Sequence, residues 1–216
     1  MTTVGVLGGT GPAGRGVAIR LASAGYDVIL GSRDETRAEV TASTLLPRGD
    51  GVIRGGTNEA AADCEVVVVA TPWDSSVATV RALREPLKGK VVISMVNALV
   101  REGKELVPLY PPRGSMAAQL AFVLPESTIV GAFHHLPASE MEDLDSGLDA
   151  DVVVFSDSAA ARTTVVQMVN DMPGLRGVEA GTMSLASATE AFTAVCITIN
   201  IRYKVHSYVK MAGLTD

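Results

Sequence analysis

Three glycines near the N-terminus have the spacing of a phosphate-binding turn. Gly9, Gly11 and Gly14 form a G-x-G-x-x-G string that follows the apolar residues 4–7 and opens a helical segment. Glycines let the backbone approach a pyrophosphate closely, and the amides at the start of the next helix favour the anion. A glycine-rich turn with no ligand is the alternative, but a position between strand and helix favours dinucleotide binding. The predicted contacts are Gly9, Thr10, Gly11, Pro12, Ala13 and Gly14.

Cations follow the second predicted strand, where an acidic residue is usual for NAD. An Asp or Glu at that point holds the ribose 2′-hydroxyl, but this chain has Gly31-Ser32-Arg33, with Arg37 four residues on. An arginine fork suits a 2′-phosphate, and on a helix the i, i+4 spacing would put Arg33 and Arg37 on one face. The alternative is a capping box from Ser32 to Glu35 with both arginines solvated. We predict that Ser32, Arg33 and Arg37 select NADP over NAD.

A third binding segment follows the all-valine run 66–69. Thr71, Pro72 and Trp73 lie just beyond this predicted strand. Doubly wound sheets hold ligands at the carboxyl ends of their strands, so we expect these three residues to line the site. The alternative for Trp73 is a core position at the start of a helix.

Two adjacent histidines are the candidates for chemistry. His134 and His135 stand at the end of the strand predicted over residues 129–134. Neighbouring residues of a strand point to opposite faces, so only one of the two is expected to face a cleft. His134 is the candidate catalytic residue, and a hydrogen-bonded structural histidine is the alternative.

Other reaction types find no support in the sequence. No G-x-S-x-G nucleophile elbow and no cluster of metal ligands is present. The first 100 residues contain no obvious lysine or Tyr-x-x-x-Lys pair that could move an alcohol proton. Hydride exchange between two ring cofactors needs mainly alignment in a dry cleft, and direct transfer needs no catalytic side chain. Small apolar residues suit the walls of such a cleft: Met95, Val96, Ala98, Leu136, Pro137 and Ala138.

Alternating apolar runs and helical patterns predict the elements that position these residues. The predicted strands are residues 4–7, 28–30, 52–53, 66–70, 91–95, 129–134 and 152–155. The predicted helices are residues 12–23, 34–45, 59–64, 73–87, 115–124, 159–172 and 183 to about 209, with loops at 107–114 and 143–151. This order is typical of an α/β, Rossmann-like doubly wound fold with a mainly parallel sheet and a small helical C-terminal part.

The predicted division is an NADP-binding Rossmann-like domain over residues 1–157 and a small C-terminal α/β portion with the long final helix over 158–216. We expect this second part to pack on the far edge of the sheet. Residues 186–203 are apolar but carry Glu190, Asn200 and Arg202, which predicts a buried helix rather than a membrane span. Those three polar residues are expected in helix–helix or subunit contacts, with ligand contact as the alternative.

Composition narrows the class of protein and its location. The chain has 216 residues, a net charge of −6 and a sequence pI near 5.1, which disfavours nucleic acid and anionic membranes as partners. Cys64 and Cys196 match no metal or redox spacing and suit a reducing cytoplasm. The first residues lack the charged region of a signal peptide. We therefore expect a cytoplasmic protein with small-molecule partners.

These motifs, taken in order, resemble the NADPH-dependent coenzyme F420 reductases (F420H2:NADP oxidoreductases). The similarity runs over nearly the whole chain, through residues 6–11, 31–33 and 37, 71–73, 134, 137–138, 174–176, which we read as a turn, 179–181 and the final helix. Two departures are Arg37, where a lysine is familiar, and residues 95–98, which are more polar than the segment expected there.

The resemblance implies a homodimer that transfers hydride reversibly between NADPH and the deazaflavin coenzyme F420. Carried over by position, Thr10, Ser32, Arg33 and Arg37 would hold the NADP phosphates, and Trp73 and Ala138 would lie near the nicotinamide. Bordering the deazaflavin would be Val96, Asn97, His134 and Leu136. Metalloreductases share the N-terminal fingerprint, so reduction of a flavin or ferric chelate is one alternative. A non-catalytic NADP-sensing module is the other.

Overall fold

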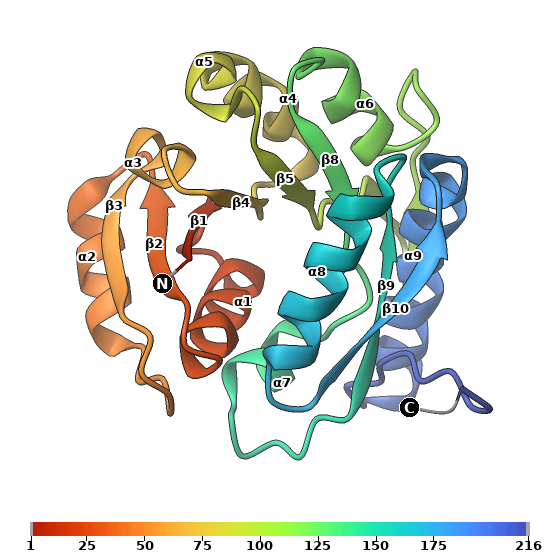
Figure 1. Cartoon of the computed structure of the whole chain (residues 1–216). Coiled ribbons are helices and arrows are strands. Elements are labelled where there is room, and N and C mark those ends of the chain that lie inside the picture. Colours follow the sequence, from red (N-terminus) through yellow and green to blue (C-terminus); the bar gives the residue numbers. More distant parts are fainter. Residues whose placement is uncertain (1, 215–216) are drawn as a thin grey trace.

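Runs of β-branched residues form the central strands of an eight-stranded sheet in the computed structural model, which describes residues 2–214 (Figure 1). The strand order is β10-β9-β8-β5-β4-β1-β2-β3. The strands are β1 (Thr3–Leu7), β2 (Asp27–Ser32), β3 (Ile53–Thr57), β4 (Val66–Val69), β5 (Val91–Ser94), β8 (Thr128–Gly131), β9 (Ala150–Phe155) and β10 (Leu175–Gly181). Residue 1 and residues 215–216, which the predicted domain ranges include, lie outside the described residues.

The sheet reverses its direction of growth beside β1. β1 pairs in parallel with β2 on one side and with β4 on the other, because the chain crosses back after β3. All other pairings within this sheet are parallel except that of β8 with β9, which is antiparallel. The carboxyl ends of β1 and β4 therefore diverge at a topological switch point, which is where open α/β sheets bind ligands.

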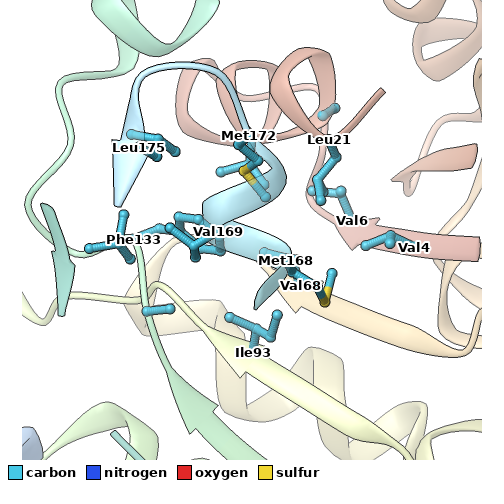
Figure 2. Packing of buried hydrophobic residues seen from close by; sticks show 14 of the residues in the cluster. Val4, Val6, Leu21, Val68, Ile93, Phe133, Met168, Val169, Met172 and Leu175 are labelled. Carbon is cyan, nitrogen blue, oxygen red and sulfur yellow. The ribbon is translucent and has the colours of Figure 1, made fainter. Parts of the chain in front are cut away.

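Helices cover both faces of the sheet. They are α1 (Pro12–Ser23), α2 (Glu35–Thr44), α3 (Asn58–Ala62), α4 (Trp73–Ala82), α5 (Arg84–Leu87), α6 (Met116–Val123), α7 (Ala138–Glu142), α8 (Ala159–Asp171) and α9 (Ala186–Tyr203), with the 3-10 turn Met183–Leu185 before the last. Valines that alternate along β4 show the two layers: Val68 packs in a cluster with α1 and α8, whereas Val67 and Val69 pack with α4 and α6. Figure 2 shows the first of these clusters, with Val4 and Val6 of β1 beside Leu21 of α1. Burial on both faces is why these strands consist of continuous apolar runs.

The predicted fold class is confirmed, but three strands, β6, β7 and β10, were not predicted. β10 was expected as a turn at 174–176; Gly174 does turn, with φ +77°, yet Leu175 and Arg176 already pair with β9. This strand carries two glycines and a glutamate, so its pairing with β9 rather than its own apolar pattern makes it a strand. The predicted loop 107–114 is wrong at its start, because β6 (Leu99–Glu102) and β7 (Glu105–Pro108) form a separate hairpin.

Two predicted helices and the acidic loop also have other boundaries. Residues 73–87 divide into α4 and α5 at Leu83. The final helix ends at Tyr203 instead of about 209, because Lys204 takes a left-handed conformation with φ +55°. The acidic loop ends at residue 149, since Ala150 and Asp151 already belong to β9.

The segment after α9 runs back along the sheet and forms what we call the C-terminal strap, residues 205–214. The Asp151 amide donates to the Val209 carbonyl, and the Asp151 carboxylate accepts from the Met211 amide at 2.5 Å. Arg176 of β10 binds the same carboxylate with two hydrogen bonds of 2.8 Å. A buried ion pair on the β9–β10 edge thus holds the strap in place.

The last helix is only partly buried. Among the described residues, one helical stretch, Met183–Tyr203, is long and apolar enough to cross a membrane by length and composition. Of its most apolar 18 residues, 28% are buried. The prediction of a buried helix is therefore met on one face, which packs on α6 and β7.

Candidate cofactor and acceptor site

A cavity of about 760 Å³ lies at the carboxyl ends of β1, β2, β4 and β5. We call it the dinucleotide cavity. The structure brings most of the predicted binding residues together here, from four separate turns. Its lining includes Gly8, Thr10, Gly11, Pro12, Ala13, Ser32, Arg33, Arg37, Asn58, Thr71, Pro72, Trp73, Asp74, Ser75, Thr79, Met95, Val96 and Asn97.

The glycines of the first turn differ in what they do. A Cβ at Gly14 would lie 2.7 Å from the Cα of Gly9, and one at Gly9 would lie 2.8 Å from the Leu30 side chain. These two glycines, which do not themselves line the cavity, allow the turn to pack. A Cβ at Gly11 would meet only the Gly8 carbonyl oxygen, at 3.5 Å, and so would project into the cavity. Gly11 therefore keeps open the space that a pyrophosphate needs.

The start of α1 is arranged to receive an anion. Gly11 is its N-cap residue and provides no side-chain cap, and Pro12 occupies the first turn. The first amides of a helix have no partner within the helix, and its dipole places partial positive charge there. The turn therefore fits the pyrophosphate of a dinucleotide.

Two unpaired arginines line the same cavity. Across residues 2–214, neither the Arg33 nor the Arg37 guanidinium makes a hydrogen bond or ion pair with the protein. The capping box from Ser32 to Glu35 is wrong, because the N-cap of α2 is Asp34, whose carboxylate accepts from the Arg37 amide at 3.0 Å. Arg33 precedes α2, so the two arginines do not share a helix face as expected, although both reach the cavity. Free guanidinium groups fit a 2′-phosphate.

Asn58 is a cavity residue that the sequence analysis missed. It begins α3 directly after β3, and its side-chain oxygen accepts a hydrogen bond from the Gly8 amide at 3.2 Å. Gly8 itself has φ +70°, a left-handed conformation that glycine adopts without strain. Asn58 thereby supports the start of the glycine turn. The predicted strand ended at residue 53, four residues before the end of β3, so the sequence pattern did not place Asn58 at the carboxyl end of a strand.

The third predicted segment also reaches the cavity. Pro72 is the N-cap residue of α4, and the Thr71 hydroxyl bonds the Ser76 hydroxyl at 3.1 Å. Trp73 is 39% exposed, so the alternative that places it in the core is wrong. Its indole stands at the rim of the dinucleotide cavity.

A second cavity of about 160 Å³ adjoins the first, and we call it the acceptor cavity. Both cavities are lined by Ala13, Met95 and Asn97, so the two spaces meet at these residues. The remaining lining comes from the turn after β8 and from the end of the chain: Phe133, His134, His135, Leu136, Pro137, Thr193, Cys196, Ile197, Asn200 and Ser207.

The prediction that only one of the two histidines faces a cleft is wrong. β8 ends at Gly131, so His134 and His135 lie in a turn and both line the acceptor cavity. The His135 ring nitrogen Nε2 is 2.7 Å from the Thr189 carbonyl oxygen. Both ring nitrogens of His134 have no partner among the described residues, and its ring stacks on Phe155 with centroids 5.5 Å apart. The hydrogen-bonded structural alternative therefore describes His135 rather than His134.

Burial determines the charge of both imidazoles. It lowers the pKa of His134 to about 3, with a further contribution from neighbouring His135. The pKa of His135 is also lowered by burial, against the hydrogen bond to Thr189. At neutral pH the His134 ring is uncharged and carries one N–H and one lone pair, and both nitrogens are buried without a partner among the described residues. Such an orphaned pair fits a ligand ring with a polar edge.

The remaining predicted residues fall on different walls. Val96 lines only the dinucleotide cavity, whereas Leu136 and Pro137 line only the acceptor cavity. Ala138 lines neither of them and begins α7, beside Gly16 of α1. Four acceptor-cavity residues on α9, Thr193, Cys196, Ile197 and Asn200, share one helix face, and only Asn200 had been considered. Their i, i+3, i+4, i+7 spacing was the signal.

Glu190 and Arg202, the other two polar residues singled out in the final helix, lie outside the acceptor cavity. Glu190 accepts hydrogen bonds from the Met116 and Ala117 amides at 2.6 and 2.8 Å, which confirms a helix–helix contact. Arg202 lines a different cavity, beside Lys104 and Glu105.

The doubly wound sheet, the glycine turn and the cavity at the switch point define a Rossmann-fold dinucleotide-binding protein. Comparisons with known proteins narrow this class. Residues 3–98 match the family described as NADP oxidoreductase coenzyme F420-dependent. The chain is 35% identical to the F420-dependent NADP reductase of Methanocaldococcus jannaschii over 93% of each chain. It is 32% identical to the enzyme of the same name from Methanothermobacter marburgensis, over 94% of this chain and 95% of that one.

A solved structure agrees with these sequence matches. The putative F420-dependent NADP reductase of Arthrobacter sp. FB24 superposes with a TM-score of 0.80 at 26% identity, over 96% of this chain and 97% of that chain. The protein belongs to the F420-dependent NADP reductase family, as its sequence motifs indicated.

Proposed function

We infer that this protein catalyses reversible hydride transfer between NADPH and the deazaflavin coenzyme F420. Beyond family membership, one structural observation carries the proposal: Ala13, Met95 and Asn97 line both cavities. Two ligands bound in spaces that share a wall can place their rings side by side. Such alignment is the main requirement of direct hydride transfer.

The residues of the dinucleotide cavity bind and orient NADP. The glycine turn and the first amides of α1 hold the pyrophosphate, and Arg33 and Arg37 hold the 2′-phosphate with Ser32 beside them. Trp73, at the cavity rim, bounds the nicotinamide side. When bound, the nicotinamide and the deazaflavin supply the two carbons, C4 and C5, between which the hydride moves.

The residues of the acceptor cavity orient the second ring and exclude water. Leu136, Pro137 and Ile197 give this cavity apolar walls. His134 is 5% exposed and uncharged at neutral pH, so its unpaired N–H donates a hydrogen bond to the polar edge of the acceptor ring. This bond stabilises negative charge that develops there, and no proton leaves the histidine.

Turnover with purified components tests the proposal. The protein is mixed with NADPH and oxidised F420, and the loss of visible deazaflavin absorbance is followed. We expect turnover with F420 and a much lower rate with a free flavin or a ferric chelate. The reverse preference would favour the metalloreductase-like alternative. Tight NADP(H) binding without transfer to any acceptor would favour a sensing module.

We also propose that the protein is a cytoplasmic homodimer. Phe192, Val195 and Ile199 recur on one face of α9 and are 46%, 48% and 40% exposed, next to the face that lines the acceptor cavity. An apolar stripe of this kind is typical of a subunit interface, and a second copy is the occupant that family resemblance suggests. The free thiols of Cys64 and Cys196 support a reducing compartment. Light scattering of the purified protein gives the mass, and cell fractionation tests the location.

A further inference from the structure

The turn that forms one wall of the acceptor cavity has a strained backbone. Phe133, directly before His134, has φ +65°. Among the described residues, only Phe133 and Lys204 are non-glycine residues with a positive φ. This conformation brings Cβ too close to the following carbonyl, and a bulky side chain tolerates it only where its surroundings impose it.

The Phe133 side chain is one of the two restraints on this turn. It is 3% exposed and belongs to the same core cluster as Val169 and Leu175 (Figure 2). The buried ring anchors the residue on the α8 side of the sheet. The next residue, His134, is on the wall of the acceptor cavity.

A hydrogen-bonded triad is the second restraint. The His134 carbonyl oxygen accepts from the Asn97 side-chain amide at 3.2 Å and lies 3.1 Å from the Thr193 hydroxyl. The same hydroxyl is 3.1 Å from the Asn97 side-chain oxygen, so its single proton is shared between two acceptors. The three residues come from three separate segments: the end of β5, the end of β8 and α9.

This triad uses both polar ends of the Asn97 side chain. Its amide donates to His134 and its oxygen accepts from Thr193, so the protein fixes the orientation of Asn97 at the wall that the two cavities share. His134 shows the reverse arrangement, because its backbone carbonyl is held and its ring nitrogens have no partner.

Resting on the proposed function, we propose that Asn97 and Thr193 are positioning residues that latch the strained Phe133–His134 turn. The latch keeps the His134 ring and the Leu136 side chain where they meet the acceptor. Without it, the turn relaxes toward an unstrained backbone and moves the cavity wall. Hydride transfer depends steeply on the separation of the rings, so a small displacement lowers the transfer rate.

Thr193→Val is the principal test, because it removes the hydroxyl and keeps the shape, and because Thr193 lines only the acceptor cavity. We expect the single-turnover rate of hydride transfer to F420 to fall about tenfold to a hundredfold, in line with losing charge-neutral positioning bonds. The Kd for NADPH should stay within about twofold, and the stoichiometry of the same titration counts the folded binding sites. Thr193→Ser restores the hydroxyl and should return the rate to within about threefold of wild type.

A cycle of variants tests whether the two residues act as one unit. Asn97→Asp keeps the acceptor oxygen and removes the donor to His134, and it should lower the transfer rate as Thr193→Val does. The double variant should lose little more than either single variant. A wild-type transfer rate in Thr193→Val, or losses that multiply in the double variant, would overturn the latch while leaving the proposed function intact.

A structural readout separates the latch from the choice of acceptor. A crystal structure of Thr193→Val should show Phe133 outside the left-handed region or the turn in more than one conformation. An unchanged turn would overturn the inference whatever acceptor the enzyme uses. Absence of turnover with F420 in the wild-type protein would instead contradict the proposed function.

Discussion

Gly11 and Gly14 show how two identical residues in one motif serve different purposes. Gly14 has no room for a side chain because of protein atoms, whereas Gly11 faces the open cavity. A methyl group at Gly14 collides with the Gly9 backbone. At Gly11 it would occupy the space that we propose for the pyrophosphate.

Gly11→Ala should therefore separate binding from stability. We expect the free energy of unfolding to change by no more than about 0.5 kcal/mol, since a Cβ there contacts only the Gly8 carbonyl oxygen. NADP affinity should fall at least about tenfold. The matched Gly14→Ala variant should lose about 1–3 kcal/mol of stability through overpacking. Urea unfolding and calorimetric titration with NADP measure both quantities, and equal destabilisation by the two variants would contradict the assignment.

We propose that Arg33 and Arg37, which both line the dinucleotide cavity, determine the choice between the two nicotinamide cofactors. In the double variant Arg33→Ala/Arg37→Ala, we expect the KM for NADPH to rise by roughly one to two decades, because a charged hydrogen bond contributes about 1.5–3 kcal/mol. The KM for NADH should change little, since NADH has no 2′-phosphate. Arg81→Ala, an exposed arginine in the last turn of α4, is the control. An equal rise for both cofactors would refute the 2′-phosphate role.

Contacts between elements depend on side chains that no local pattern reveals. α9 and α6 are joined through Glu190, whose carboxylate binds the first two amides of α6. Burial raises the pKa of Glu190 to about 7, although the two N–H donors favour its ionised form. The link between these helices is consequently sensitive to pH.

The pH dependence of Glu190 has a definite sign. A pKa raised from 4.5 in the unfolded chain to about 7 means that the folded state holds the proton more tightly. Stability from this group is complete below pH 4.5 and is lost as pH rises through 7. Relative to Glu190→Gln, the free energy of unfolding of the wild type should fall by up to about 1.4 kcal/mol per pH unit between pH 4.5 and about 7. Urea unfolding of both proteins at pH 5, 6 and 8 measures this difference, and a constant difference would exclude it.

Residues distant in the chain meet only in the complete molecule, and the C-terminal strap is an example. Ser207 of the strap lines the acceptor cavity and is held by Asn200 through hydrogen bonds of 2.8 and 2.6 Å. The ion pair of Asp151 with Arg176 secures the same strap at Met211. Arg176 holds the pKa of Asp151 below its ordinary value. One wall of the acceptor cavity thus depends on the far edge of the sheet.

Arg176→Gln should destabilise the whole fold. The Asp151 carboxylate, whose side chain is fully buried, loses its main cationic partner, and breaking a buried pair typically costs about 3–5 kcal/mol. In the matched variant Arg162→Gln, the residual carboxylate is Glu179, whose side chain is 47% exposed, so the loss should be nearer 1 kcal/mol. Thermal and urea unfolding compare the two. Similar losses of stability in the two variants would show that the buried ion pair does not hold the strap in place.

The local motifs were sufficient to predict the fold of the half that contains the dinucleotide cavity, and the NADP contacts within it stay predictions. The glycine spacing, the arginines after β2 and the apolar runs are short-range patterns, and each reflects a constraint that acts within one βαβ unit. Parallel strands that are buried on both faces must be continuously apolar, so β1, β4 and β5 could be predicted from the sequence. The domain boundary at 157/158 stays a prediction, although β10 does join the sheet edge.

The acceptor half depended on contacts between distant residues. β10 exists because β9 offers a pairing edge, and His134 and His135 share a cavity because the chain turns after Gly131. Thr193, Asn200 and Ser207 belong to this cavity only because α9 and the strap return across the sheet. Local sequence encodes backbone conformation and the side of an element that is apolar. Which elements meet follows from the shared burial of the whole chain, and no window of neighbouring residues contains that information.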